Sequence, residues 1–197
     1  MALRPAVLLD RDGTMIRDVG YLDRRDNLQW YPWTLDAVRL LNRAGFVVCV
    51  TTNQGGIGLG LYSETFVQDL HAEMGETLAT AGARVDGWFY CPHHPRAVTE
   101  AFRAECNCRK PAPGMARQAA ERFDLDLTAS YVVGDKASDV GLAGSVGAQG
   151  VMLRTGHGET ELAGRGGAMP EAAYVAADLM EATSWILGRS GHLRGDA

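Results

Sequence analysis

Short apolar runs alternate along this chain with longer segments whose apolar residues recur at helical spacing. The runs Ala6–Leu9 and Gly45–Val50 are each closed by polar residues, as buried strands are, and Leu35–Ala44 between them repeats apolar residues every three or four positions. A strand, a helix and a second strand in this order predict a parallel crossover. The alternation therefore favours the α/β class, with a doubly wound parallel sheet.

The same alternation continues to the C-terminal part of the chain. Ser63 is a candidate N-cap for a helix that ends near Ala81. The further expected elements are strand Trp88–Tyr90, helix Gly114–Phe123, strand Tyr131–Val133, helix Ser138–Val146, strand Gly150–Leu153, strand Tyr174–Ala176 and helix Leu179–Leu187. We expect one domain over residues 1–188 with a loop insertion at about 91–108. The tail over 189–197 is rich in Gly, Arg and Ser and is expected to be flexible.

Charge and hydropathy exclude several classes of partner. The 197 residues carry 19 Lys and Arg against 24 Asp and Glu, a formal net charge of −5, and no basic stripe follows a helix or strand, so a nucleic-acid partner is not expected. The apolar runs are far shorter than the ~20 residues of a membrane span, and no signal peptide is recognisable. We expect a cytoplasmic monomer without a membrane partner.

Two carboxylates follow the first expected strand, in Asp10-Arg-Asp-Gly-Thr14. Ligands of doubly wound sheets bind beyond the carboxyl ends of the strands, so these two residues are candidates for a binding or catalytic site. Asp10 and Asp12 could converge on one hard cation, or act as nucleophile and general acid on one phosphoryl group. Taken alone, the same residues are equally typical of a polar turn.

Two other strand ends carry similar chemistry. Thr51–Gly56 follows the second strand with hydroxyl and amide groups, and Gly134-Asp135-Lys136 follows the fourth. Asp, Thr and Asp at three strand ends of one sheet are hard to explain as turns or caps. The glycines of Gly56–Gly60 do not form a dinucleotide fingerprint, because Leu61 stands where the third glycine is due.

Hard-cation chemistry predicts a divalent metal at these strand ends. Oxygen ligands from Asp10 and Asp135, completed by water and phosphate, suit Mg²⁺. A phosphoryl group bound there needs a cation and neutral donors, for which Lys110 and Thr52 are the candidates.

A second metal site is indicated by three of the four cysteines. Cys91-Pro-His93 and Cys106-Asn-Cys108 supply three thiolates and one imidazole, a set that suits tetrahedral Zn²⁺. His93 is preferred over the adjacent His94 on the pattern. With all four positions filled by protein the zinc would be structural, and because residues 95–105 have little apolar content, the metal is expected to fasten the loop. Cys49 lies within a strand and is assigned to the core.

These motifs together resemble the four motifs of the haloacid-dehalogenase (HAD) superfamily of phosphohydrolases. The matching residues are Asp10-x-Asp-Gly-Thr14, Thr52-Asn53, Lys110 and Gly134-Asp135-x-x-x-Asp139. The stretches Thr52-Asn-Gln-x-Gly-Ile57, Cys91-Pro-His-His-Pro95 and Cys106-x-Cys-Arg-Lys-Pro111 narrow the resemblance to the D-glycero-D-manno-heptose 1,7-bisphosphate 7-phosphatase family and its histidinol-phosphatase relatives. The likeness covers roughly residues 5–155.

The resemblance implies an aspartyl-phosphate mechanism. Asp10 would attack phosphorus, and Asp12 would protonate the leaving sugar oxygen and then activate water. Mg²⁺ would be held by Asp10, the backbone carbonyl of Asp12 and Asp135, with Asp139 supporting these ligands from behind. The residues expected to contact substrate are Asp18, Val19, Gly20, Tyr21, Thr52, Asn53, Gln54, Gly55, Arg109, Lys110 and Lys136.

Two departures from the family pattern bear on the substrate. Relatives commonly read Ile-Ala-Arg-Gly where this chain has Ile57-Gly-Leu-Gly60, and Pro-Gly where it has Pro32-Trp-Thr34. Residues 15–34 are too few for a separate cap domain, so we expect an open site.

The expected substrate is a small phosphosugar, above all the C7 phosphate of the heptose bisphosphate, and histidinol phosphate is the alternative. A receiver-like phospho-acceptor domain is disfavoured, because it needs neither Asp12 nor a zinc loop.

Overall fold

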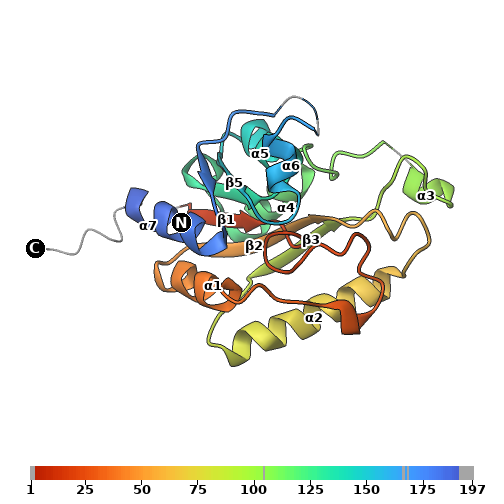
Figure 1. The fold of residues 1–197 in the computed structure, drawn as a ribbon, viewed down its shortest axis with the longest axis horizontal. Helices are drawn as coiled ribbons and strands as arrows, with labels where there is room; N and C mark the ends of the chain where they lie inside the picture. The colour runs from red at the N-terminus through yellow and green to blue at the C-terminus, as the bar shows by residue number, and fades with distance from the viewer. Residues whose placement is uncertain (1–2, 104, 166, 168, 191–197) are drawn as a thin grey trace, which may run out of the picture.

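The computed structural model describes residues 3–103, 105–165, 167 and 169–190. Within them, six parallel strands form one sheet in the order β3-β2-β1-β4-β5-β6 (Figure 1). The strands are β1 Ala6–Leu9, β2 Val47–Asn53, β3 Gly87–Cys91, β4 Tyr131–Gly134, β5 Gln149–Leu153 and β6 Tyr174–Ala176. The chain runs outward from β1 to β3 and then crosses to β4 on the other side of β1. The predicted doubly wound sheet is confirmed.

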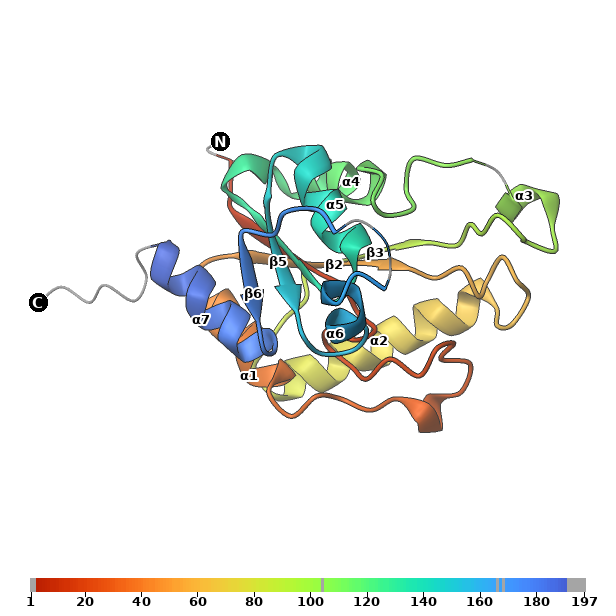
Figure 2. The ribbon, with the colours of Figure 1, turned by 45° about the horizontal axis from the view of Figure 1, so that its top comes forward.

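Helices cover both faces of the sheet (Figures 1 and 2). The helices are α1 Thr34–Arg43, α2 Glu64–Thr80, α3 Glu100–Arg103, α4 Gly114–Phe123, α5 Ala137–Val146, α6 Gly158–Leu162 and α7 Leu179–Arg189, with 3-10 turns at Arg25–Asn27 and Leu127–Ala129. Alternate strand residues point to opposite faces. Val7 and Leu9 therefore pack with α1, α2 and α7, whereas Ala6 and Leu8 pack with α4 and α5.

Most element boundaries agree with the sequence prediction within a few residues. Ser63 caps α2, where its hydroxyl oxygen accepts a hydrogen bond from the backbone N–H of Phe66 at 3.0 Å. Cys49 is fully buried in β2, as expected for a core residue. The short helices α3 and α6 were not expected, because helices of 4 and 5 residues are too short to show a repeat.

Two ends differ from the prediction. β2 was expected to stop at Val50 but continues to Asn53, because its last residues pair with β3 as far as Asn53 opposite Cys91. Helix α7 was expected to stop at Leu187 but continues through Arg189, so Arg189 is helical rather than part of the tail predicted over 189–197. The rest of the predicted tail, residues 191–197, lies outside the described residues.

The segment between β1 and α1 forms a small flap rather than a cap domain. Arg17 N donates to Gln29 O at 2.8 Å and Thr34 Oγ1 donates to Met15 O at 2.7 Å, which folds the segment back against the sheet. Helix α3 lies at the same end of the sheet as this flap, and α7 lies at the opposite end, in both ribbon views (Figures 1 and 2). In the part of the chain that the structure describes, no helix is long and apolar enough to cross a membrane.

Candidate active site and metal centres

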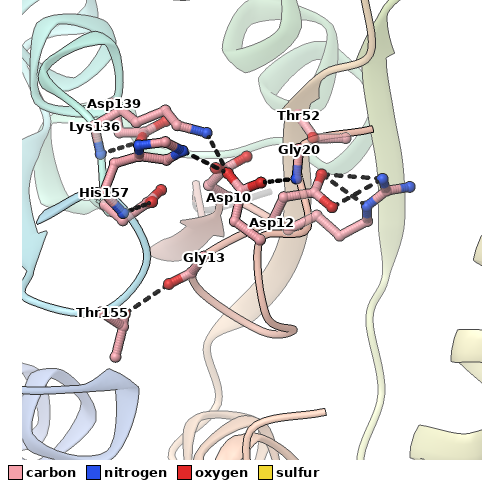
Figure 3. Close-up of polar contacts among 12 residues, drawn as sticks. Asp10, Asp12, Gly13, Gly20, Thr52, Lys136, Asp139, Thr155 and His157 are labelled. Atoms are coloured by element: carbon pink, nitrogen blue, oxygen red, sulfur yellow. Dashed lines mark hydrogen bonds and ion pairs between the residues drawn. The ribbon is translucent and has the colours of Figure 1, made fainter. Parts of the chain in front are cut away.

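Three buried carboxylates meet at the carboxyl ends of β1 and β4. Asp10, Asp135 and Asp139 each offer an oxygen, and these oxygens all lie within 4.8 Å of one another. Figure 3 shows Asp10 and Asp139 in this group, with Asp12, Thr52 and Lys136 around them. So many negative charges in a buried space need cations close by.

Asp135 has the chemistry of a metal ligand. Its Oδ2 accepts a hydrogen bond from His157 N at 2.7 Å, while its buried Oδ1 has no hydrogen-bond partner among the described residues. Burial, followed by the charge of Asp10, raises the pKa of Asp135 to about 8. A hard cation at Oδ1 would satisfy this oxygen and favour the ionised form. The residues present therefore fit a magnesium site.

Two glycines make room for the Asp135 carboxylate. A Cβ on Gly13 would lie 2.2 Å from Asp135 Oδ2, and a Cβ on Gly156 would lie 2.1 Å from the same atom. Gly13 also has a positive φ of +86°, which L side chains rarely adopt. Thr155 fastens this turn by donating its hydroxyl to Gly13 O at 2.6 Å (Figure 3). The glycine of the Asp10-x-Asp-Gly motif is thus required by the neighbouring carboxylate.

Lys110 supplies the counter-charge at the centre of the carboxylate group. Its Nζ lies 2.8 Å from Asp10 Oδ1, 2.6 Å from Asp139 Oδ1 and 2.7 Å from Thr51 O. Burial alone would lower the pKa of Lys110, but the charges of Asp10 and Asp139 outweigh it and raise the pKa. For Asp139, burial raises the pKa to about 6 despite this pairing. Lys110 is therefore charged at neutral pH and shared by two carboxylates.

Asn53 holds the backbone that carries Lys110. Lys110 N donates to Asn53 Oδ1 at 3.0 Å, and Asn53 Nδ2 donates to Lys110 O at 3.3 Å. Asn53, which is expected to contact substrate, thus also anchors the backbone of Lys110. The extension of β2 through Asn53 is what brings this amide to the site.

A small cavity of about 40 Å³ opens above Asp10. It is lined by Asp10, Asp12, Thr52, Asn53, Lys110, Lys136 and Ser138. It shares Asn53, Lys110, Lys136 and Ser138 with a larger cavity of about 440 Å³. A phosphoryl-sized space next to Asp10 thus adjoins a chamber large enough for a sugar.

The larger cavity gathers most of the residues predicted to contact substrate. It is lined by Asp18, Gly20, Tyr21, Asn53, Gly55, His94, Arg109, Lys110, Lys136, Ser138 and His157. Three predicted residues do not line it: Val19 borders an adjacent cavity, Gln54 is buried, and Thr52 lines only the small cavity. Thr52 is buried at the small cavity, where its Oγ1 accepts a hydrogen bond from Gln54 Nε2 at 2.9 Å.

Asp18 is fixed at the rim by the side chains of Lys136 and His157. Its Oδ2 lies 2.9 Å from Lys136 Nζ and 3.1 Å from His157 Nε2. Burial opposes the charge of Asp18, but Lys136 more than offsets this and holds the pKa below its usual value. The pairing draws the flap against α5 and α6 and gives Lys136 a fixed position.

Sequence reasoning missed Ser138, His94 and His157 as cavity residues. Ser138 lies within the strand-end motif that begins at Gly134, and His157 follows the end of β5. The rule that ligands bind beyond strand ends could therefore have found both. His94 had been considered only as a metal ligand.

The four predicted zinc ligands form a compact cluster. His93 Nδ1 lies 3.5 Å from Cys91 Sγ and 3.3 Å from Cys108 Sγ, and Cys91 Sγ lies 3.7 Å from Cys106 Sγ. Tetrahedral zinc with bonds of about 2.3 Å places sulfurs roughly 3.8 Å apart. The distance from Cys91 Sγ to Cys106 Sγ matches this spacing, and the distance from Cys91 Sγ to Cys108 Sγ is shorter, at 3.2 Å. The four residues are compatible with a zinc site. His94 is turned elsewhere, and its Nδ1 accepts a hydrogen bond from Arg96 N at 3.1 Å. The choice of His93 over His94 agrees with this geometry.

The loop that carries these ligands is better fastened than its composition indicated. Arg103 donates twice to Ala97 O, at 3.1 and 2.8 Å, and Ala97 is buried. Val98 N donates to Gly58 O at 2.8 Å. The expectation that a metal fastens the loop stays a prediction, and these hydrogen bonds, invisible in composition, hold the loop as well.

Arg109 joins the cluster of Cys91, His93, Cys106 and Cys108 to the larger cavity. Its Nη1 donates to the backbone carbonyl of His93 at 3.0 Å, so the guanidinium rests on a ligand-bearing residue. The side chain also lines the larger cavity. The position of this cation over the cavity therefore depends on the backbone around His93.

Comparison with known proteins defines the class to which this fold and site belong. A family model described as HAD-hydrolase-like matches residues 107–182. The crystal structure of D,D-heptose 1,7-bisphosphate phosphatase from B. bronchiseptica, complexed with magnesium and phosphate, superposes with a TM-score of 0.84 at 34% identity, covering 94% of this chain and 99% of that one. The molecule is a phosphatase of the HAD superfamily, a phosphoric monoester hydrolase.

Relatives of known name narrow the class further. The chain is 44% identical over 154 residues to the D-glycero-beta-D-manno-heptose-1,7-bisphosphate 7-phosphatase of Escherichia coli, covering 77% of this chain and 80% of the relative. It is 41% identical over 187 residues to the D-glycero-D-manno-heptose-1,7-bisphosphate 7-phosphatase of Thermosynechococcus vestitus, covering 93% and 95%. The chain belongs to the D-glycero-D-manno-heptose 1,7-bisphosphate 7-phosphatase family. The resemblance seen in the sequence motifs is confirmed.

Proposed function

We propose that this enzyme removes the C7 phosphate from D-glycero-D-manno-heptose 1,7-bisphosphate. The observation that carries the proposal is the pair of joined cavities, one of phosphoryl size beside Asp10 and one of sugar size lined by Arg109 and Lys136. A substrate with two phosphates has a second anionic group to place near these cations. The names of the relatives support the same substrate.

Asp10 is proposed as the nucleophile. A carboxylate oxygen of Asp10 attacks phosphorus, the bond from phosphorus to the sugar oxygen breaks, and Asp12 gives its proton to that oxygen. Asp12 then takes a proton from water, whose oxygen attacks the phosphorus of the aspartyl-phosphate and restores Asp10. Lys110 and the hydroxyl of Thr52 balance the charge that develops on the phosphoryl oxygens.

The two metals are assigned to separate sites. Asp10, the carbonyl of Asp12 and Asp135 would hold Mg²⁺, with Asp139 supporting them through Lys110. When bound, Mg²⁺ supplies positive charge against the phosphoryl oxygens. Zn²⁺ is assigned to the Cys₃His cluster defined by Cys91, His93, Cys106 and Cys108, with a structural role because no ligand position stays open.

We assign the activity to a single chain in the cytoplasm. The described residues of one chain supply every group of both proposed sites, and free cysteines at the cluster suit a reducing compartment. One domain over residues 1–188 fits the continuous sheet from β1 to β6.

Turnover of a panel of phosphate esters tests the proposed substrate. We expect the heptose 1,7-bisphosphate to give the largest kcat/KM, above heptose monophosphates, histidinol phosphate and an aryl phosphate. Arg109→Ala should lower kcat/KM for the bisphosphate by about 10-fold or more and affect the aryl phosphate less, because a charge contact to the distal phosphate is lost.

The panel also separates the alternatives. Preference for histidinol phosphate would replace the proposed substrate by that ester. A phosphorylated chain that accumulates without turnover would indicate a phospho-acceptor domain instead.

Magnesium should stabilise the protein more at high pH than at low pH. Burial raises the pKa of Asp135 from 3.8 to about 8 and that of Asp139 from 3.8 to about 6, so between about pH 4 and 8 the folded state binds more protons than the unfolded chain. The free energy of unfolding of the metal-free protein should therefore fall as pH rises through this window. Mg²⁺ should raise the melting temperature more at pH 8 than at pH 5.

Thermal unfolding with and without Mg²⁺ measures this effect. Magnesium is removed by gel filtration, which spares the tightly held zinc. Asp135→Asn is the matched control, because it keeps the shape of the side chain but should remove most of the magnesium response and leave only the lower part of the pH window, which Asp139 sets. An equal Mg²⁺ shift at both pH values would contradict the assignment.

Loss of a zinc ligand should impair catalysis through Arg109. Cys108→Ser should lower the zinc content and reduce kcat/KM for the bisphosphate by about 10- to 100-fold, because a shift of about 1 Å in a substrate-binding group has effects of this size. Zinc per chain and kcat/KM are measured together. Cys49→Ala is the control, since Cys49 is a buried thiol remote from the cluster in sequence and should leave zinc bound. Wild-type kinetics in a zinc-free Cys108→Ser variant would make the cluster a stability element only.

A further inference from the structure

Arg11 lies between Asp10 and Asp12 in the sequence, yet the proposed mechanism does not use it. Its side chain is 1% exposed and is among the largest that are fully buried. Its Nε lies 3.1 Å from Asp12 Oδ2 and its Nη2 lies 3.1 Å from Asp12 Oδ1, a two-pronged pair. A buried guanidinium usually costs stability unless its donors are all used. The other hydrogen-bond partners of Arg11 therefore indicate the role of the Arg11–Asp12 ion pair.

His71 of α2 accepts a hydrogen bond from the far side of the guanidinium. Arg11 Nη1 lies 3.2 Å from His71 Nε2, and because arginine can only donate, this ring nitrogen carries no proton. The ring is buried and stacks on Trp88 of β3, with 4.6 Å between centroids and 20° between planes. Burial, followed by the charge of Arg11, lowers the pKa of His71 to about 3. His71 is thus a neutral, immobile acceptor.

Gln54 closes the network on the other side. Its Oε1 accepts from Arg11 Nη2 at 3.0 Å and from the Tyr62 hydroxyl at 2.9 Å, while its Nε2 donates to Asp12 Oδ2 and Thr52 Oγ1, each at 2.9 Å. All four hydrogen-bonding positions of the amide are used, so it has one orientation. Gly56 makes room for Tyr62, since a Cβ there would lie 2.4 Å from the ring.

The consequence is that the Asp12 carboxylate is held at both oxygens. Three donors reach it, two from Arg11 and one from Gln54. Asp12 nevertheless stays 15% exposed and lines the small cavity with Asp10. A carboxylate that only stabilised the fold would have no reason to face this cavity.

We propose that His71, acting through Arg11, positions the Asp12 carboxylate for proton transfer to the leaving oxygen. This inference rests on the proposed function, which makes Asp12 the general acid and base. His71 touches neither substrate nor the reacting atoms and is a positioning residue. Its ring fixes one end of the guanidinium, and the other end fixes the carboxylate within hydrogen-bond reach of the ester oxygen.

The test separates orientation of Asp12 from stability by the choice of leaving group. An alkyl sugar phosphate needs a proton on its leaving oxygen, whereas the nitrophenolate of p-nitrophenyl phosphate departs readily without one. The constant to measure is kcat/KM, because it includes the step in which the leaving group departs from phosphorus. His71→Phe keeps the aromatic stack on Trp88 but removes the acceptor. His71→Gln restores an acceptor at a similar distance from the backbone.

We expect His71→Phe to lower kcat/KM about 10-fold for the sugar phosphate and less than about 2-fold for p-nitrophenyl phosphate. His71→Gln should recover most of the loss. Trp88→Phe is the matched control: it disturbs the stack but leaves the acceptor, and both substrates should change alike and little. If His71→Phe does not fold, Tyr62→Phe tests the inference instead, because it removes one hydrogen-bond donor to Gln54. It should lower kcat/KM for the sugar phosphate about 3-fold and affect p-nitrophenyl phosphate less.

Other results would overturn the inference. Equal loss for both substrates in His71→Phe, unchanged kinetics, or no recovery in His71→Gln would make the network structural only. Absence of turnover by the wild-type enzyme on every ester would overturn the proposed function itself, and the inference with it.

Discussion

Asp10→Asn should abolish turnover, with kcat reduced by at least about 10³-fold, because an amide cannot attack phosphorus and form the aspartyl-phosphate. The substitution is nearly isosteric, and Asn can still accept the hydrogen bond that Lys110 donates to Asp10 Oδ1. The fold should therefore survive. Initial rates on the best sugar phosphate, with Mg²⁺ in excess, measure the loss, and circular dichroism confirms folding.

Asp26→Asn serves as the control for a lost carboxylate. Asp26 is exposed in the 3-10 turn of the flap and should show wild-type kinetics. Acid-quenched samples of the wild type should also contain phosphate bound to the chain, and samples of Asp10→Asn should not. Near-normal turnover in Asp10→Asn would rule out the aspartyl-phosphate mechanism.

Lys110→Met should damage both activity and stability. Methionine matches the length of lysine, but Asp10 and Asp139 lose the buried cation that they share. Breaking a buried ion pair costs about 3 to 5 kcal/mol, and loss of a charge that faces the phosphoryl group should lower kcat/KM by about 10²-fold or more. Urea unfolding and steady-state kinetics measure the two effects.

The stability loss in Lys110→Met should itself depend on pH. At pH 5 the carboxylates can take up protons and relieve their repulsion, so the loss should be smaller than at pH 8. Arg122→Met on α4 is the control, because it removes a positive charge from a surface helix and should cost little at either pH. Equal stability of Lys110→Met and the wild type at pH 8 would contradict the central position of Lys110.

The fold could be predicted from the sequence because its elements repeat one simple pattern. Helix α4 and strand β6 have the bounds that apolar spacing indicated, and Ser63 caps α2 as a Ser at that position should. The predicted element boundaries are wrong where contacts between distant parts of the chain determine the secondary structure. Thr51, Thr52 and Asn53 are polar and looked like a loop, but pairing with β3 makes them part of β2.

The part of the candidate site that lies directly after the strands could be predicted from the sequence. Asp10, Thr52 and Asp135 were found from their place after apolar runs, and the Cys and His spacing indicated the second cluster. The hydrogen-bond network around Asp12 could not be predicted from the sequence. His71 lies in the middle of α2, where its spacing indicates only that it belongs to the buried face of the helix. No spacing rule connects positions 11, 54, 62 and 71, which meet only when the sheet forms.

The two lysines of this chain, Lys110 and Lys136, both line the larger cavity, and arginine supplies all the other side-chain positive charges among its 19 basic residues. Reagents selective for primary amines would therefore modify these two cavity residues and the N-terminal amino group but no other position. The side chain of Lys136 is 35% exposed and that of Lys110 is 2% exposed, so Lys136 should react first. Amine labelling thus offers a direct readout of occupancy: a bound phosphate ester should shield Lys136, while the surface arginines stay unmodified.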